Sequence, residues 1–595
     1  MSARAALYAA AHGALVLDAA RRLTACTTAT SIRGFAESTV SLKNSDLDEQ
    51  LRIAAQSSMT TLAVGEGQGS SYQGRLEDVP IGGRTLQLRA FGAARAVDDI
   101  PYTALWSETR TNLFSVLTNR IEPNTLETRY QFGQDNQLLI APRKNEVFGN
   151  TTTQKGGGLY YDCPDRGSRQ IVGVQFSFQI NAPDVNWTAA LLTYTLNPTA
   201  FITSVWSQAS VAGVITGSIH LSGITGADRI LFFFRRTVAD AVYAGETGFL
   251  FLNITNLRFV TSVTNRVNTT LTVARANGAG VTCTVGSTAR MYVGQQLVFT
   301  SGANSEMVTV ASVPTSTTFT CTVVNGPGGT YPIGTTVQGH VVYPDEIVRD
   351  CVTTVAALNT NQLSSATNRI QTGDIDCLTD GWEDASMSSV LSKMASYGDT
   401  AKNPWGWWVD RDKNLVFERR GLNGYTFYVD VTPEQLDVIR STADAYNSAY
   451  AVYQDANGRT VRSTASTDAA AVSRYGLTRR TAVPVQTTSS IQAGLIRDTY
   501  LQDKKTPQPK IRIPGVTALY DAGGNRVPLS APNAGRGDTI RIRNLSPVLP
   551  GDAEQLRSFR LGYCQVDWLA GTLTLESETP PEGLETLYAQ QEART

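Results

Sequence analysis

Histidines, paired carboxylates and cysteines are the residues of this chain whose types could support a reaction. The three histidines, His12, His220 and His340, lie far apart in the sequence. Side chains that share a metal ion usually recur at short, characteristic spacings. The spacing therefore predicts no metal site, and we expect hydrogen-bonded or solvated histidines.

Adjacent carboxylates occur at Glu383-Asp384 and at Asp98-Asp99. Glycoside hydrolysis needs two carboxyl groups about 5–10 Å apart across a cleft, which adjacency in the sequence does not provide. Surface or helix-capping roles are the favoured interpretation. The chain also lacks the G-x-S-x-G, H-E-x-x-H and Walker patterns. We therefore expect no catalytic residue, no cofactor and no enzymatic activity.

The cysteines are odd in number, and none belongs to a C-x-x-C pair. Neither a zinc site nor a disulfide scaffold is therefore predicted, and free thiols are expected. Cys283 and Cys321 fall in the same predicted β-rich segment, and the sequence leaves open whether they pair. The other cysteines are Cys26, Cys163, Cys351, Cys377 and Cys564.

Three aromatic residues are candidates for binding a glycan. Trp187, Tyr194 and Trp206 could stack on sugar rings, because an aromatic face offers apolar area beside a polar edge. The alternative is that they fill the core of a β-sandwich. Because large aromatic side chains are usually mostly buried, the core is the favoured interpretation.

Two further motifs have structural interpretations. The cluster Trp405, Trp407 and Trp408 is expected in a core or at a subunit interface, where aromatic residues are enriched. Arg536-Gly537-Asp538 is an Arg-Gly-Asp triplet, the kind of sequence that some adhesion proteins present. A Gly-Asp turn that opens a strand at Thr539 explains it better.

Composition bounds the class of protein. The chain has 595 residues, for which about four domains are expected. Its hydrophobic fraction of 42% suffices for large cores, and 51 basic against 52 acidic residues give a net charge of −1. That balance argues against a dedicated nucleic-acid surface but does not exclude local patches. Polar residues interrupt the Ala-rich segment 1–26 too often for a signal peptide, and no membrane span is predicted.

Short runs of Thr, Ser, Val and Gly favour strands over helices through most of the chain. The predicted fold class is therefore mainly β with some α. Residues 108–262 contain period-two alternation and the apolar run 229–234, which indicate a β-sandwich or jelly roll. Residues 263–343 contain five short strand patterns and are expected to form a small inserted β-barrel or sandwich.

Helical periodicity is clearest in the second half of the chain. Residues 345–358 form an amphipathic pattern, and Asp384 is expected to cap a second helix that follows it. Residues 405–409 and 415–418 are expected to pair as a hairpin. A further helix is expected from Ser490 to Leu501.

The stretch 446–483 has the pattern of a framework sheet. Its first nine residues alternate as in a strand, and Asp455-Ala-Asn-Gly458 supplies turn chemistry because Asn and Gly tolerate positive φ. The return strand begins at Arg459. Its tyrosines and arginines are expected on sheet faces and in subunit contacts rather than in a reaction centre.

Several segments occur in an order that resembles the tail-tip or baseplate hub proteins of tailed bacteriophages, also called minor tail proteins. They cover roughly 1–107 and 344–580. The segments are Gly74-Arg-Leu-Glu-Asp, Ala90-Phe-Gly-Ala, Asp98-Asp-Ile-Pro-Tyr-Thr-Ala-Leu-Trp106, Gly381-Trp-Glu-Asp-Ala-Ser-Met387, Met394-Ala-Ser-Tyr-Gly-Asp399, the hairpin at Asn447, Tyr475-Gly-Leu-Thr-Arg and Gly537-Asp-Thr-Ile-Arg-Ile.

The resemblance implies a virion protein made in the host cytoplasm, with β-barrel-like tube domains that form a homo-oligomeric ring of three copies. It further implies contacts with the tail tube, the tape-measure protein and a tip fibre or spike. Genomic DNA would pass the channel without specific binding, and no stable membrane insertion is expected. The expected division is a hub β-domain over 1–107, a sandwich over 108–262, a small β-domain over 263–343, an α/β region over 344–440, a hub β-domain over 441–580 and a polar tail over 581–595.

Two other functions remain open from the sequence. The inserted modules resemble phage carbohydrate-binding modules, so the chain could be a receptor- or glycan-binding tail adhesin. Alternatively, it could be a tail-associated cell-wall lysin, although we find no lysozyme or peptidase signature.

Overall fold

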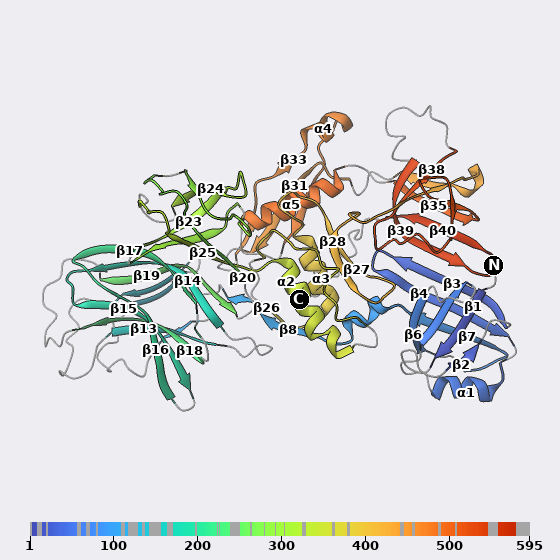
Figure 1. Cartoon of the computed structure of the whole chain (residues 1–595), viewed down its shortest axis with the longest axis horizontal. Coiled ribbons are helices and arrows are strands. Elements are labelled where there is room, and N and C mark those ends of the chain that lie inside the picture. The colour runs from blue at the N-terminus through green and yellow to red at the C-terminus, as the bar shows by residue number, and fades with distance from the viewer. Residues whose placement is uncertain are drawn as a thin grey trace.

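The computed structural model is elongated and built mostly of strands, with helices gathered near its middle (Figure 1). Four hydrophobic cores divide it into a β framework, a central α/β unit, a β-sandwich and a small β-barrel. The mainly-β, multi-domain class expected from the sequence is confirmed. The structure describes residues 3–8, 15–18, 22–43, 45–55, 61–66, 72–78, 81–108, 114–116, 129–133, 137–141, 156–163, 171–196, 199–222, 224, 227–237, 250–261, 265–278, 280–291, 293–302, 304–323, 329–359, 363–377, 381–440, 445–454, 459–485, 490–505, 509–544 and 557–578.

The β framework begins with antiparallel strands and a short helix from the N-terminal part of the chain. The strands pair in the order β2-β1-β5-β6-β7-β4-β3. In β7, Leu86, Leu88 and Ala90 are buried and alternate with exposed residues, as in a sheet with one face on a core. The elements are β1 (Ala3–Tyr8), β2 (Leu15–Asp18), β3 (Leu23–Ser31), β4 (Gly34–Lys43), α1 (Leu47–Ala55), β5 (Thr61–Glu66), β6 (Tyr72–Asp78) and β7 (Thr85–Phe91).

The second half of the framework comes from the C-terminal part of the chain. Strand β39 pairs with β3 from Thr27–Asp567 to Ser31–Tyr563, so strands from both ends of the sequence lie side by side (Figure 1). Both halves contribute to one core. The elements are β29 (Thr426–Val429), η4 (Pro433–Gln435), β30 (Asp437–Arg440), β35 (Pro509–Val516), β36 (Leu519–Tyr520), β37 (Arg526–Val527), β38 (Thr539–Ile542), β39 (Ser558–Asp567) and β40 (Thr572–Ser577).

Residues 107–261 form two facing sheets with a core between them. One sheet has the order β11-β12-β19-β14-β17, with β9 beside β19, and the other has the order β10-β13-β18-β15-β16. The elements are β9 (Ser107–Glu108), β10 (Ser115–Val116), β11 (Arg129–Gly133), β12 (Gln137–Ala141), β13 (Gly156–Asp162), β14 (Ile171–Ala182), β15 (Trp187–Leu196), β16 (Thr199–Ala209), β17 (Gly213–Ser222), β18 (Arg229–Arg236) and β19 (Phe251–Thr261).

The next segment forms a small barrel around a core of its own. Its strands pair in the order β20-β25-β22-β23-β24-β21, and a bridge between Leu271 and Val285 joins the two ends of that order. Strand β25 had no counterpart among the five strands expected from the sequence. The elements are β20 (Asn265–Thr270), β21 (Val281–Thr284), β22 (Gln296–Ser301), β23 (Asn304–Ser312), β24 (Thr318–Val323) and β25 (Thr336–Val341).

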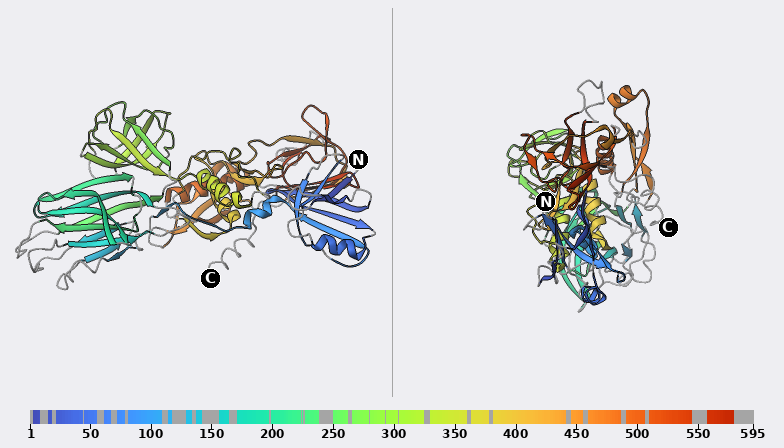
Figure 2. Two further views of the ribbon diagram at one scale, coloured as in Figure 1. Left: turned by 60° about the horizontal axis from the view of Figure 1, so that its bottom comes forward. Right: turned by 90° about the vertical axis from the view of Figure 1, so that its right-hand side faces the viewer.

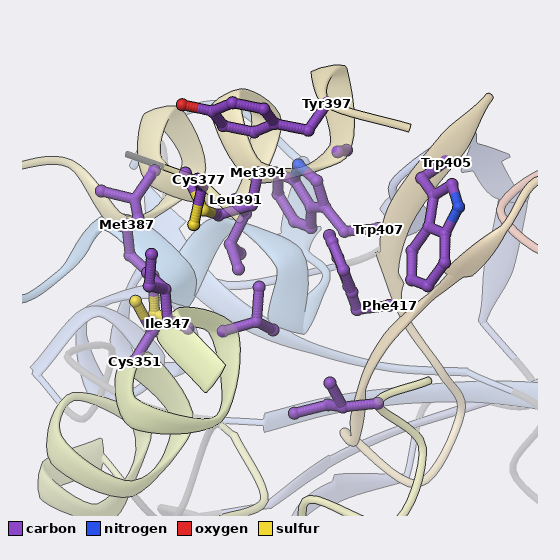
Figure 3. Close-up of a cluster of buried hydrophobic side chains, with 14 of the residues drawn as sticks. Ile347, Cys351, Cys377, Met387, Leu391, Met394, Tyr397, Trp405, Trp407 and Phe417 are labelled. Atoms are coloured by element: carbon purple, nitrogen blue, oxygen red, sulfur yellow. The ribbon is translucent and has the colours of Figure 1, made fainter. Parts of the chain in front are cut away.

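The central α/β unit packs helices against a tryptophan-rich hairpin. Ile347 of α2, Leu391 of α3 and Phe417 of β28 point toward one another beside Trp405 and Trp407 of β27 (Figure 3). This core contains most of the tryptophan cluster, which confirms the expected core role. The elements are η1 (Ala93–Asp98), β8 (Tyr102–Leu105), α2 (Pro344–Thr354), η3 (Ala356–Asn359), β26 (Gly381–Ala385), α3 (Met387–Ser396), β27 (Trp405–Val409), β28 (Leu415–Arg419) and α5 (Ser490–Lys504).

Helix α3 starts later than the sequence predicted. Ser386 is its N-cap, and the Ser386 side chain accepts a hydrogen bond from the Ser389 backbone N–H. Asp384 instead lies in β26 with a φ of 49°, where its carboxylate accepts from the Thr103 hydroxyl at 3.1 Å. The expected Asp384 cap is therefore wrong, because residues 381–385 belong to β26, which pairs with β8 and shifts register between Trp382 and Ala385, so the helix starts only after Ser386.

The stretch 446–485 forms a projection that we call the arm, with α4 at its outer end (Figure 1). Its strand β31 pairs antiparallel with β32 and β33 and parallel with β34. The expected turn at 455–458 and the polar tail at 581–595 lie outside the described residues. The elements are β31 (Ser448–Gln454), β32 (Thr460–Arg462), β33 (Ser466–Thr467), α4 (Ala469–Tyr475) and β34 (Arg480–Pro484).

The cores divide the chain at different places from the borders expected at 107 and 440. Val97 and Trp106 pack in the central core, as do Ala449 and Val483 of the arm. Phe427, by contrast, belongs to the framework core, because β29 pairs with β38. Short strands are thus assigned to a unit by their pairing partners rather than by their position in the sequence.

Candidate functional site

Two of the three candidate glycan-binding aromatics lie inside the sandwich. Trp187 is 1% exposed and Trp206 is 9% exposed, and both belong to the core between the sheets. The Trp206 ring packs edge-on against Phe176, with 5.2 Å between ring centroids. A ring enclosed in this way offers no face to a sugar. Trp187 and Trp206 therefore fill the core, as in the favoured interpretation, and do not serve as the alternative glycan-stacking rings, because both side chains point inward from their strands.

The outer face of one sandwich sheet is covered by the small barrel, which lies above it in the left view of Figure 2. The Ser177 hydroxyl lies 3.3 Å from the Met307 sulfur, and Gln175 donates to the Gln296 carbonyl. Ser305 of the barrel also bonds to the Ser218 carbonyl. This sheet face, formed by β14 and β17, is therefore an internal contact.

A buried ion pair joins the sandwich to the central unit. Arg258 of β19 donates to both carboxylate oxygens of Asp376, at 2.8 and 3.2 Å. The Asp376 side chain is 1% exposed and also accepts from the Val342 backbone N–H at 3.1 Å. Two parallel hydrogen bonds fix the direction of approach as well as the distance. The inserted sandwich is thus held in one orientation.

The outer face of the other sandwich sheet carries a different set of aromatic residues. Tyr160 of β13 faces Leu231 of β18, which in turn faces Leu192 of β15. In the next rows of the same face, Phe233 stands opposite Gly158, and Tyr194 stands opposite Arg229. We call Tyr160, Leu192, Tyr194 and Phe233, which are half-buried, the sandwich platform; Leu231 between them is only 2% exposed.

Charge borders the sandwich platform at one end. The Arg229 guanidinium lies 3.8 Å from the centroid of the Tyr160 ring and donates to Asp162 at 2.6 and 3.2 Å. Donating a hydrogen bond to Asp162 raises the pKa of Arg229, so the guanidinium stays charged. Apolar rings beside charged donors and acceptors are the combination that recognises sugars.

Sequence reasoning missed Tyr160 and Phe233. In the apolar run 229–234, Ile230, Phe232 and Phe234 enter the core between the sheets and Leu231 is also buried, whereas Phe233 is half-buried on the other face. Period two along a strand could have identified the outward residues once the strand was assigned to a sandwich.

A cleft of about 850 Å³ lies where the framework meets the central unit. Arg33 crosses it: its guanidinium lies 4.1 Å from the Trp407 ring and donates to the Trp407 carbonyl and to the Ser392 hydroxyl. Three arginines and three acidic residues line it, so the cleft has no dominant charge. Its lining includes Ser31, Glu37, Arg75, Phe91, Arg95, Asp98, Asp99, Ser388 and Tyr563.

The paired carboxylates have partners that explain them without catalysis. Asp98 accepts from the Ser388 backbone N–H at 2.8 Å, in the first turn of α3. Asp99 pairs with Arg75, and Asp384 bonds to Thr103. Negative charge at a helix N-terminus is favourable because the helix dipole is positive there. These contacts match the capping and surface roles expected from the sequence.

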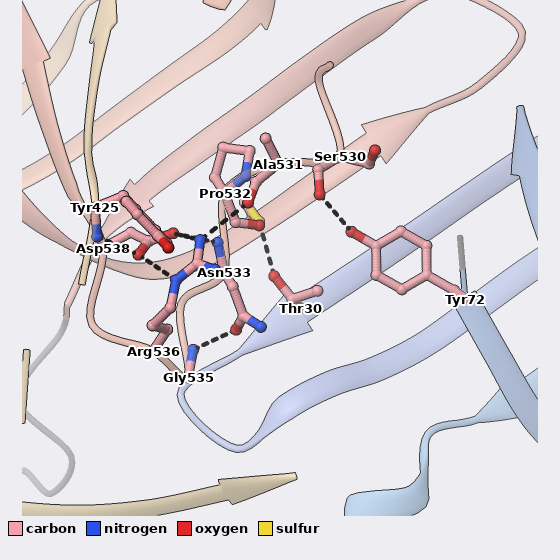
Figure 4. A network of polar contacts seen from close by, with 11 residues as sticks. Thr30, Tyr72, Tyr425, Ser530, Ala531, Pro532, Asn533, Gly535, Arg536 and Asp538 are labelled. Atoms are coloured by element: carbon pink, nitrogen blue, oxygen red, sulfur yellow. Dashed lines mark hydrogen bonds and ion pairs between the residues drawn. The ribbon is translucent and has the colours of Figure 1, made fainter. Parts of the chain in front are cut away.

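The Arg-Gly-Asp triplet folds inward. Asp538 is fully buried, and its oxygens accept from the Tyr425 and Asn533 backbone N–H groups, both at 2.8 Å, and from the Arg536 guanidinium (Figure 4). Gly537 adopts a φ of 76°, which favours glycine, and the strand β38 begins at Thr539. The expected turn is confirmed, and the Asp538 carboxylate is not offered to a partner.

The described cysteines are free thiols, and most are buried. Burial raises the pKa of Cys26 and Cys564 to about 12, so these thiols stay protonated and unreactive. Cys283 and Cys321 point toward each other with 3.5 Å between their sulfurs, a hydrogen-bond distance rather than a bond.

Within the described residues, no group of His, Cys, Asp or Glu side chains is arranged to hold a metal ion. His12 lies outside those residues, as does the His340 side chain, and His220 is partly buried on β17. No described helix is long and apolar enough to cross a membrane.

Comparison with known proteins gives likenesses of shape. No family model and no curated protein matches the chain. It is similar to the prophage tail protein gp18 from Listeria monocytogenes EGD-e, with 9% identity and a TM-score of 0.27, covering 56% of this chain and 95% of that one.

A second similar structure is the 43 kDa tail protein of prophage MuSo2 from Shewanella oneidensis, with 11% identity and a TM-score of 0.25, covering 54% of this chain and 94% of that one. Part of the chain is similar to a CBM4 structure, with 8% identity and a TM-score of 0.17, covering 26% of this chain and 89% of that one. At such TM-scores these likenesses assign neither a fold nor a function to this chain.

Proposed function

We propose that this chain is a structural protein of a phage tail, the hub at the tail tip or baseplate. The observation that carries the proposal is the framework. Strands from the first and last parts of the chain close one sheet around one core, and residues 107–341 project from it as separate modules. The segments that resemble tail hubs lie in the framework, the central unit and the arm, so the resemblance follows the structural division.

In this role the chain acts mechanically, as a ring of three copies that continues the tail tube to the tip. Among the described residues, β2 pairs with β1 alone and β30 with β35 alone. Such free strand edges are surfaces that a ring would cover by repeating one contact. The partners are the tail tube, the tape-measure protein and a tip fibre or spike, and the chain has no enzymatic activity.

Cryo-electron microscopy of intact virions tests this role. We expect the chain in a symmetric ring at the tail tip, with the framework around the channel and the sandwich directed outward. Location in the capsid, or absence from the particle, would contradict it. Zymography on host cell wall tests the third possibility, a lysin, and a cleared zone would overturn the non-enzymatic role.

A second candidate function, glycan adhesion, is favoured by the sandwich platform. The barrel packs against part of the face formed by β14 and β17, whereas the opposite face carries rings beside the Arg229–Asp162 pair. Tyr160→Ala combined with Phe233→Ala should weaken binding of the whole chain to host-cell surfaces about tenfold or more.

The matched control is Val214→Ala on β17, a strand of the barrel-facing sheet, at a residue that is 56% exposed. It should leave binding unchanged. Equal losses in both variants, or binding that survives the loss of both rings, would remove the adhesion role.

A further inference from the structure

The arm is more basic than the rest of the chain. Residues 446–485 contain five arginines against two aspartates, whereas the whole chain has a net charge of −1. The arm projects from the central unit, so this charge lies on an extended surface (Figure 1). The arm therefore differs in net charge from the rest of the chain.

The strand pairing decides which side of the arm sheet carries this charge. Ala449, Ala451 and Val483 turn inward and pack in the central core, beside α5. Residues that alternate with them face outward. Arg480 of β34 pairs with Ser448 of β31, and Arg462 of β32 pairs with Val452 of β31. Both guanidinium groups therefore lie on the outer face.

The partners described for Arg462 and Arg480 on the outer face carry no negative charge. The Arg462 guanidinium lies 5.5 Å from the Tyr450 ring centroid, and Arg480 donates from Nε to the Ser448 hydroxyl at 3.0 Å. Both arginines are exposed, and neither forms an ion pair with a described residue. The neighbouring Asp468 carboxylate accepts a hydrogen bond from the Ala471 backbone N–H of α4 at 2.9 Å, and its other oxygen lies 3.0 Å from Lys505 Nζ.

Two further arginines of the arm also lie over tyrosine rings. Arg479 lies 5.3 Å from the Tyr446 ring centroid, and Arg474 lies 5.7 Å from that of Tyr475. A guanidinium held over a tyrosine ring keeps its charge and its outward N–H groups. The arm thus carries Arg462 and Arg480 on the outer face of its sheet and two further ring-packed arginines elsewhere.

We propose that this outer face, which we call the arm face, binds the phosphate backbone of nucleic acid independently of sequence. Guanidinium groups match phosphate geometry, and displaced counterions make the contact favourable. Protein-binding surfaces instead centre on buried apolar anchors surrounded by a polar rim. Charge spread over the arm face fits a polyanion better than a protein partner.

Fluorescence anisotropy with the full chain and labelled DNA tests the arm face. Arg462→Gln with Arg480→Gln should weaken binding about tenfold at low ionic strength. With duplex DNA, it should also reduce the slope of log affinity against log salt by about 1.8, because each lost phosphate contact contributes about 0.9. Arg462→Lys with Arg480→Lys should keep most of that slope, since the charge remains. Separate measurements with single-stranded and duplex DNA show which of the two forms the arm face prefers.

The control is Arg512→Gln with Arg526→Gln, which removes the same charge from exposed framework residues. It should bind DNA as the unaltered chain does. Absence of DNA binding by the unaltered chain, or an equal loss in the control, would overturn the proposal. Competition by poly-glutamate as strong as that by DNA would point to an acidic protein instead. Binding is measured on the purified chain, so its outcome is independent of where the chain sits in a virion.

Discussion

Single side chains contribute to how the units of this molecule are joined. The Arg258–Asp376 pair is an example, because it lies between the sandwich and the central unit and is almost completely buried. A buried charge is tolerated only while its partner is present. The orientation of the sandwich therefore depends on a pair of residues that sequence patterns did not identify.

Arg258→Met should destabilise the chain by about 3–5 kcal/mol, because it leaves the Asp376 carboxylate buried without its counter-charge. Adding Asp376→Asn should recover part of that loss, since the neutral amide oxygen can still accept from the Val342 N–H. Chemical unfolding followed by tryptophan fluorescence measures both. A single variant as stable as the unaltered chain would show that the pair does not hold the junction.

At the scale of elements, periodicity predicted α2, α3, α5 and many strands but missed α1, α4 and β25, whereas pairing decided where strands begin and how they face. The helix expected from Ser490 to Leu501 and the hairpin of 405–409 with 415–418 are both present. The start of α3 was misplaced, because Asp384 has the right chemistry for a cap but lies in a paired strand. A cap is defined by backbone geometry that composition does not contain.

Ser386→Ala should therefore destabilise α3 by about 1 kcal/mol, because the Ser389 N–H loses its acceptor. Asp384→Ala is the matched comparison and should change stability by less than about 0.5 kcal/mol, since its one side-chain contact is an exposed bond to Thr103. Thermal unfolding of both variants checks this. A larger loss for Asp384→Ala would restore it as the helix cap.

For the whole molecule, the decisive feature is that distant segments close the framework. Strands β3 and β39 are neighbours in one sheet although they lie at opposite ends of the chain. The modules between them carry their own cores, so they can be long without disturbing the framework. This arrangement leaves the sandwich platform and the arm face as two outward surfaces of different chemistry, one aromatic and one basic.

The sequence by itself determined the mainly-β class, the approximate extent of the inserted modules, helices α2, α3 and α5 and the turn at Gly537, because each depends on local propensity and short-range periodicity. The tertiary structure alone decided which residues reach the surface. Trp187 and Trp206 are core residues and Tyr160 and Phe233 are outward ones, since the direction of a strand residue depends on the sheet it joins. Composition did not predict the arm face, because the net charge of −1 is a sum over the whole chain, whereas strand pairing places Arg462 and Arg480 on one face.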